Sequence, residues 1–148
     1  MRISCSVNGA ATTLEARADE MLLDVLRRQL GLTSVRPTCG IGVCGACTAL
    51  VDGEPVSTCL VLAPLAEGRE ITTVEGLGGN HRVQRAFVEE HAYQCGYCTP
   101  GFILTVARLL EEIPSPTDEE IALGLAGNLC RCGSYVKIAD AVRRAAAA

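Results

Sequence analysis

The sequence predicts an α+β protein with two domains, one built on a β-sheet over residues 1–76 and an all-α domain over residues 80–148. Three observations predict this division. Short apolar stretches alternate with the turn signals Asn8-Gly9 and Asp52-Gly53 in the first region. Apolar residues recur at helical spacing in the second region. Between them, Gly76-Leu77-Gly78-Gly79-Asn80 contains three glycines, which interrupt helices and strands alike.

In the first region, one helix is expected among several short strands. Asp19 is a candidate N-cap for a helix from Met21 to Leu30, which Gly31 would end. The expected strands are Arg2 to Val7, Thr12 to Ala16, Thr48 to Val51, Val56 to Leu60 and Ile71 to Val74. A helix packed across such strands predicts a β-grasp sheet.

The second region predicts four helices. Val83, Phe87 and His91 recur at the spacing of a first helix. Pro100 fits the opening of a second, because the N–H that proline lacks has no partner at a helix start, and Pro114 would end it. The third begins at the capping box Thr117-Asp118-Glu119-Glu120, and the fourth runs from Tyr135 to Ala147.

Composition and charge exclude some functions. A net charge of −4 and an isoelectric point near 5.2 disfavour nucleic-acid binding, and no basic stripe appears. No apolar run reaches the ~18 residues of a membrane span. The first residues carry no apolar signal-peptide core, so we expect a cytoplasmic location. Because the cytosol keeps thiols reduced, the nine cysteines favour metal or cluster ligation over disulfides.

The first group of cysteines has the spacing Cys39-x4-Cys44-x2-Cys47, followed by Cys59. This is the plant-type pattern for a [2Fe–2S] cluster, which takes four thiolates. Glycines at positions 40, 42 and 45 would let the loop aim backbone N–H groups at negatively charged sulfur. The alternative is a structural zinc site, but zinc sites are usually built from paired C-x2-C or C-x2-H units.

The second group is Cys95-x2-Cys98 together with Cys130-x-Cys132. Each pair precedes an expected helix, so two helix N-termini would stabilise the negative charge of one cluster. Taken alone, this spacing fits zinc as well. The presence of a complete first quartet in the same chain favours a second [2Fe–2S] cluster.

These motifs resemble the two-[2Fe–2S] iron–sulfur subunit of the xanthine oxidase family, the molybdenum hydroxylases. The resemblance extends over nearly the whole chain. It is carried by Cys39-x4-Cys44-Gly45-Ala46-Cys47, Thr73-Val74-Glu75-Gly76-Leu77, Gln94-Cys95-Gly96-Tyr97-Cys98-Thr99-Pro100-Gly101 and Asn128-Leu129-Cys130-Arg131-Cys132. Two departures, neither at a ligand, are Thr38 where the family usually has Gly and Gly133-Ser134 where it usually has Thr-Gly.

The resemblance implies a ferredoxin-like β-grasp domain with a cluster near solvent and a four-helix domain with a buried cluster. It also implies an electron-transfer subunit without catalytic residues, which receives electrons from molybdopterin on a separate large subunit. Gln94 would contact the pterin, and the plant-type cluster would pass electrons to an FAD-binding subunit or another acceptor. The Gly133-Ser134 variant resembles members whose acceptor is not always a flavin subunit. The substrate is chosen on another chain.

Two different functions remain open from the residues alone. A free-standing two-cluster ferredoxin would carry the same cysteines, but it would not expose large apolar patches. A zinc-stabilised interaction module would be colourless. Outside the quartets, Cys5 is expected to be a small buried apolar residue, and His81 and His91 are expected to lie at the surface or at helix ends.

Overall fold

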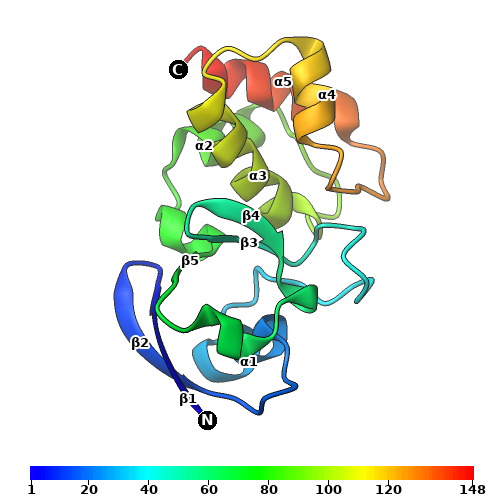
Figure 1. Cartoon of the computed structure of the whole chain (residues 1–148). Coiled ribbons are helices and arrows are strands. Elements are labelled where there is room, and N and C mark those ends of the chain that lie inside the picture. The colour runs from blue at the N-terminus through cyan, green and yellow to red at the C-terminus, as the bar shows by residue number, and fades with distance from the viewer.

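The computed structural model describes residues 1–148 and has two lobes, each with its own hydrophobic core (Figure 1). The N-terminal lobe contains the sheet and one α-helix, and the C-terminal lobe contains four helices. The predicted α+β class, with a β-grasp domain before a helical domain, is confirmed. The domain limits 1–76 and 80–148 stay a prediction. Val74 and Leu77, just before the expected boundary, pack against the second core.

The sheet has five strands in the order β2-β1-β5-β3-β4. β1 and β2 form an antiparallel hairpin, β5 pairs in parallel with β1, and β3 pairs antiparallel with both β5 and β4. The strands are β1 (Arg2–Val7), β2 (Ala10–Glu15), β3 (Thr48–Val51), β4 (Glu54–Ser57) and β5 (Glu70–Thr72). The hairpin turns at Asn8, which accepts a φ of 51° as asparagine does in such turns.

Helix α1 (Leu22–Leu30) packs against the first core through its buried residues Leu22, Val25 and Leu26. The helix ends at Gly31 in the left-handed conformation, as predicted. The predicted cap is wrong. Met21 occupies the N-cap without a side-chain bond, so Asp19 lies too early in the chain to cap the helix, and its carboxylate pairs with Arg17 instead.

Three strands differ from prediction by a few residues. β2 lies slightly earlier than expected, and β4 ends at Ser57 because the chain then enters a 3-10 turn over Thr58–Leu60. The Thr58 hydroxyl donates to the carbonyl of Cys47 at 2.7 Å, which ties this turn to the start of β3. β5 likewise ends before a 3-10 turn over Val74–Leu77.

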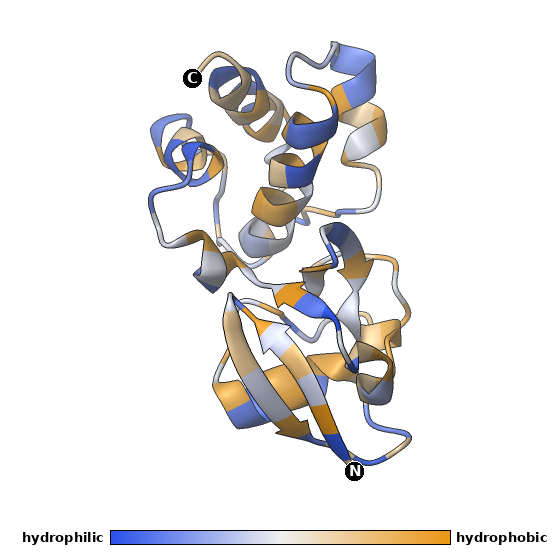
Figure 2. Cartoon of the chain, turned by 60° about the vertical axis from the view of Figure 1, so that its left-hand side comes forward, coloured by the Kyte–Doolittle hydropathy of each residue, from blue (hydrophilic) through white to orange (hydrophobic).

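The second lobe is built around α3, whose residues from Gly101 to Val106 are all buried. Its helices carry both orange apolar and blue polar segments (Figure 2), and their buried apolar residues form the second core. The helices are α2 (Arg82–Glu89), α3 (Thr99–Glu112), α4 (Asp118–Gly124) and α5 (Tyr135–Ala146). None of the chain's helices combines the length and apolarity needed to cross a bilayer.

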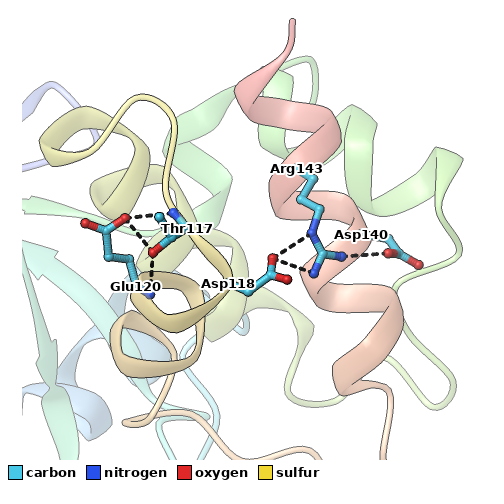
Figure 3. Close-up of polar contacts among 5 residues, drawn as sticks. All are labelled: Thr117, Asp118, Glu120, Asp140 and Arg143. Atoms are coloured by element: carbon cyan, nitrogen blue, oxygen red, sulfur yellow. Dashed lines mark hydrogen bonds and ion pairs between the residues drawn. The ribbon is translucent and has the colours of Figure 1, made fainter.

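The predicted capping box begins α4. The Glu120 N–H donates to the Thr117 hydroxyl at 3.3 Å, and the Thr117 N–H donates to the Glu120 carboxylate at 2.7 Å (Figure 3). Arg143 on α5 bridges Asp118 at 2.8 Å and Asp140 at 2.9 Å, which joins α4 to α5. His81 caps α2, so its predicted capping role is confirmed.

A carboxylate joins the segment after β5 to the first lobe. Glu75 accepts hydrogen bonds from the Ser34 N–H at 3.0 Å, from the Ser34 hydroxyl and from the Thr73 hydroxyl at 2.6 Å. Thr73 in turn is held by the Asn8 side chain, whose oxygen accepts from the Thr73 N–H at 2.8 Å. Burial raises the pKa of Glu75, but these hydrogen bonds outweigh it and leave that pKa below its usual range.

The first prediction concerns this network. Because the folded pKa of Glu75 is lowered, its stabilisation is fully present above the unfolded pKa and is lost as pH falls through the folded value. We expect E75Q to cost roughly 1 kcal/mol near neutral pH, or about 2–4 °C in melting temperature. The difference from wild type should shrink on acidification. Anaerobic thermal unfolding at a fixed scan rate measures both effects.

The control is E70Q, because Glu70 is exposed and its side chain has no hydrogen bond. A loss of stability in E75Q that stays equal from neutral to acidic pH would show that the charge of Glu75 is not the cause.

Candidate metal centres

The four cysteines of the first quartet come together as two pairs of thiols. Cys39 and Cys44 lie in the loop between α1 and β3, Cys47 immediately precedes β3, and Cys59 lies in the 3-10 turn after β4. The Cys39 thiol lies beside that of Cys44, and the Cys59 thiol lies beside that of Cys47. The hairpin β3–β4 therefore brings Cys59 back to the loop that holds the other three cysteines.

The loop of the first quartet is arranged for anionic sulfur. Backbone N–H groups of Ile41, Cys44 and Val43 point at the Cys39 sulfur and lower its pKa to about 6, helped by the Cys44 thiol. Gly40, Gly42 and Gly45 have φ between 67° and 74°, which confirms why the loop is rich in glycine.

The second pair of thiols in this quartet is more enclosed. Burial raises the pKa of Cys59 to about 11, helped by the neighbouring Cys47 thiol, although the Gly42 N–H acts in the opposite direction. A buried thiol is deprotonated readily only when a metal binds it. The pair therefore fits ligation better than free thiol chemistry.

The second quartet also consists of two pairs, and each pair takes one thiol from each segment. Cys95 lies beside Cys132, and Cys98 lies beside Cys130. The Tyr97 N–H and then the Cys132 thiol lower the pKa of Cys95. Cys98 is the N-cap of α3, and Cys132 lies just before α5, so both pairs lie at helix starts as predicted.

Burial dominates the inner pair of the second quartet. It raises the pKa of Cys98 to about 12, with a further contribution from the Cys130 thiol. Burial also acts on Cys130, but the Ser134 N–H, which donates to its sulfur at 3.4 Å, and the Ser134 side chain leave its pKa below the usual value. Cys130 is further fixed by its own N–H, which donates to the Tyr135 hydroxyl at 2.8 Å.

The arrangement fits a two-iron cluster better than zinc. A tetrahedral zinc ion needs all of its ligands about 2 Å from one point. A [2Fe–2S] cluster spreads four thiolates over two irons, two on each iron. The pairing of thiols in both quartets matches that distribution.

Exposure separates the two quartets. Cys95 and Cys132 are exposed, Cys98 is half-buried and Cys130 is buried, whereas in the first quartet Cys39 and Cys44 are half-buried and the other two cysteines are buried. The resemblance implied that the cluster of the second quartet is buried. In the isolated chain, the second quartet is more exposed than the first. Cys5, the ninth cysteine, is buried in the first core as expected.

A tight backbone contact fixes the distance between the two sites. The Leu129 N–H donates to the Cys44 carbonyl at 2.9 Å, and the Asn128 side chain donates to the Gly45 carbonyl at 3.2 Å. Thr105 on α3 holds the opposite end of the Asn128 amide at 2.9 Å. At Gly101, an added Cβ would lie 2.2 Å from the Gly45 carbonyl oxygen, so only glycine fits at this position.

A second group of contacts lies beside the first. The Arg36 guanidinium donates to the carbonyls of Gly96 and Tyr97, both at 2.7 Å, and lies 4.9 Å from the centre of the Tyr97 ring. The Tyr97 hydroxyl donates to the Pro37 carbonyl at 2.9 Å. These bonds join the loop of the first quartet to that of the second.

Sequence reasoning found the cysteines but not these connecting residues. Arg36, Thr105 and Asn128 were not predicted to have a role, although Asn128 belongs to the motif that carries the resemblance. Gln94 was predicted to contact a pterin. Its side chain is exposed, and its amide donates to the carbonyl of Cys132 at 2.9 Å, so it lies at the open edge of the second site.

Two family comparisons match these two regions. Residues 5–74 match the family described as a 2Fe-2S iron-sulfur cluster binding domain, and residues 73–143 match the family described as a [2Fe-2S] binding domain. The chain is therefore an iron–sulfur protein with two [2Fe–2S]-binding domains.

The full-length relatives are more specific. The chain is 48% identical over 146 residues to the nicotinate dehydrogenase small FeS subunit of Eubacterium barkeri, covering 97% of this chain and 93% of the relative. It is 48% identical over 144 residues to the nicotine 6-hydroxylase small subunit of Paenarthrobacter nicotinovorans, covering 96% and 87%. It belongs to the two-cluster iron–sulfur subunits of the xanthine oxidase family, and thus to the electron-transfer subunits of oxidoreductases.

Solved structures of oxidoreductases contain the same fold as this chain. A chain of quinoline 2-oxidoreductase from Pseudomonas putida 86 superposes with a TM-score of 0.95 at 43% identity, covering 99% of this chain and 93% of that one. The aldehyde oxidoreductase of Desulfovibrio desulfuricans superposes with a TM-score of 0.94 at 41% identity. There the match covers 99% of this chain but 17% of the longer one.

The second prediction tests the contact at Gly101. In G101A, the added methyl meets a backbone carbonyl that cannot rotate away, so we expect a loss of roughly 1–3 kcal/mol in stability. The lobes should also separate more readily. The measurements are the anaerobic melting temperature and the rate of limited proteolysis in residues 76–80.

The matched control is G127A, because a Cβ at Gly127 meets no atom within 4 Å. Equal stability and equal cleavage rates in the two variants would contradict the proposed packing constraint.

Proposed function

We propose that this chain is the electron-transfer subunit of a heteromeric molybdenum hydroxylase. Cys39, Cys44, Cys47 and Cys59 hold one [2Fe–2S] cluster, and Cys95, Cys98, Cys130 and Cys132 hold the second. The observation that carries the proposal is the closing of both quartets as two thiol pairs within one rigidly connected chain. The clusters, when bound, supply one-electron chemistry between a molybdopterin centre on a large partner subunit and an acceptor.

The chain's own residues position the two sites and stabilise negative charge. Cys44 and Cys130 belong to different quartets, yet the hydrogen bond from the Leu129 N–H to the Cys44 carbonyl joins their backbones directly. The path from Cys44 to Cys130 therefore crosses one hydrogen bond and otherwise follows the covalent backbone of Leu129. Backbone N–H groups around Cys39 and Cys130 offset the charge added on reduction.

The open second site supports a partner at that face. Exposed Cys95 and Cys132 lie with the exposed Gln94, and Tyr93 and Tyr97 are each more than 40% exposed nearby. A cofactor used for electron transfer at such an edge needs cover from water. We place the large molybdopterin-binding subunit here, with Gln94 at the pterin.

The first site supports a second partner. Ile41, Val43 and Leu60 are each more than half exposed, and Leu60 packs beside Gly42 of the ligand loop. An apolar patch of this kind marks a protein interface and disfavours a free-standing ferredoxin. We place the acceptor here, an FAD-binding subunit or another electron acceptor. None of the nine cysteines forms a disulfide, which fits a cytoplasmic complex.

The third prediction concerns the ligands. We expect four iron atoms per chain and two distinct [2Fe–2S] EPR signals after reduction by dithionite. C98S should lose one signal and about half of the iron, because the remaining three thiols cannot complete the second quartet. C47S should instead lose the signal of the first quartet. Iron, zinc and sulfide analysis on the same samples accompanies the spectra.

C5S is the matched control, because Cys5 is buried in the first core and belongs to neither quartet. It should keep all of the iron and both signals. Stoichiometric zinc at the second quartet, with one EPR signal in the wild type, would contradict the two-cluster assignment.

The fourth prediction tests the function itself. The chain is tagged in its native host and purified anaerobically, and molybdenum, pterin, flavin and co-purifying chains are measured. A panel of N-heterocycles, purines and aldehydes is then added. We expect one substrate class to reduce both EPR signals in the complex, and no substrate to reduce them in the chain alone.

A chain that purifies alone, carries both clusters and exchanges electrons with several unrelated reductases would favour the free-standing ferredoxin. Oxidation of substrate by the chain without molybdopterin would also contradict the proposal.

A further inference from the structure

Ser134 has a hydroxyl with no partner in the protein. It is 6% exposed, and its Oγ atom is buried without a hydrogen bond. Ser134 occupies the N-cap of α5, where serine normally accepts a hydrogen bond from the second or third N–H of the helix, yet it forms no such bond. A buried hydroxyl left unpaired costs stability, so this orientation requires a reason.

The hydroxyl lies against the second quartet. The N–H of the same residue donates to the Cys130 sulfur at 3.4 Å, which places Ser134 directly over that thiol. The side chain also lowers the pKa of Cys130. The neighbouring Tyr135 accepts the Cys130 N–H at 2.8 Å, so the sulfur and the hydroxyl are both held by the first residues around α5.

The surroundings of the Ser134 hydroxyl favour the Cys130 sulfur as its acceptor. It does not cap the helix, and it is too buried for bulk water to reach. It does not join the network of Asn128 and Thr105, whose polar atoms are paired with each other. The acceptor that the structure places beside Ser134 is the Cys130 sulfur, and a thiolate is a far better acceptor than a thiol.

We propose that the Ser134 hydroxyl donates a hydrogen bond to the Cys130 thiolate when that thiolate ligates iron, and that it raises the reduction potential of the second cluster. This inference rests on the proposed function, because it requires a [2Fe–2S] cluster in the second quartet. Hydrogen bonds to the sulfurs of a cluster favour its reduced, more negative state. Ser134 is thus a tuning residue that acts through a ligand.

The position of this site has a consequence for electron flow. The second quartet lies at the face where we place the molybdopterin subunit, so its cluster receives electrons first. A higher potential there favours the transfer out of the molybdenum centre. The hydroxyl provides this shift without a charge, which a buried position would tolerate poorly.

The test compares wild type, S134A and S134T as full chains with their clusters assembled. EPR-monitored redox titration gives a midpoint potential for each cluster. We expect S134A to weaken reduction of the second cluster about tenfold, a lowering of 59 mV for a one-electron couple, while the first cluster does not move. S134T keeps the hydroxyl and should stay near the wild-type value.

Resonance Raman spectra provide a readout that a change in folding alone would not move. The iron–thiolate stretching modes should shift in deuterium oxide in wild type and S134T, and the part of that shift due to the hydroxyl should disappear in S134A. If S134A fails to hold the second cluster, the wild type alone provides the test. Its hydroxyl exchanges with deuterium before the buried Ser134 N–H does. A shift of the iron–thiolate modes at early times therefore supports the hydrogen bond from the hydroxyl, and no early shift contradicts it.

The outcomes separate this inference from the proposed function. Absence of a second [2Fe–2S] signal in wild type would contradict the function, and the inference with it. Two normal signals with an unchanged potential and an unchanged isotope shift in S134A would overturn the inference alone.

Discussion

The structure depends on one close contact between backbones, the approach of Gly45 to Gly101 and Asn128. It lets the ligand loop of the first quartet lie against the start of α3, at which the second quartet begins. Without side chains in the way, carbonyl and amide groups meet directly and bond. The two lobes have separate cores, so this junction, more than any shared core, fixes one metal centre relative to the next.

Much of the fold and of the site was readable from the sequence because the signals were local. The capping box at Thr117, the turn at Asn8 and the four helices depend on nearby residues, and all are present. The two groups of four cysteines were predicted from their spacing, and in the structure each group comes together as two pairs of thiols. Strand ends were less accurate, because 3-10 turns at Thr58 and Val74 replace the last residues expected in β4 and β5.

The features that the sequence did not predict depend on contacts between residues that are far apart along the chain. Arg36 has no local signature, yet it holds carbonyls about 60 positions away along the chain. Asp19 was predicted to cap α1, but in the structure its carboxylate forms an ion pair with Arg17. Ser134 appears in the sequence only as part of a departure from the family pattern, and its burial and its missing partner are what indicate a role.

The exposure of Cys95 and Cys132 has a consequence for maturation. An iron–sulfur donor can reach these thiols while the chain is free, but a large subunit docked on the same face would close that access. If the large subunit docks on this face, as proposed, the second cluster would have to be inserted before the two subunits associate. The exposed face would then serve first for cluster insertion and afterwards for docking.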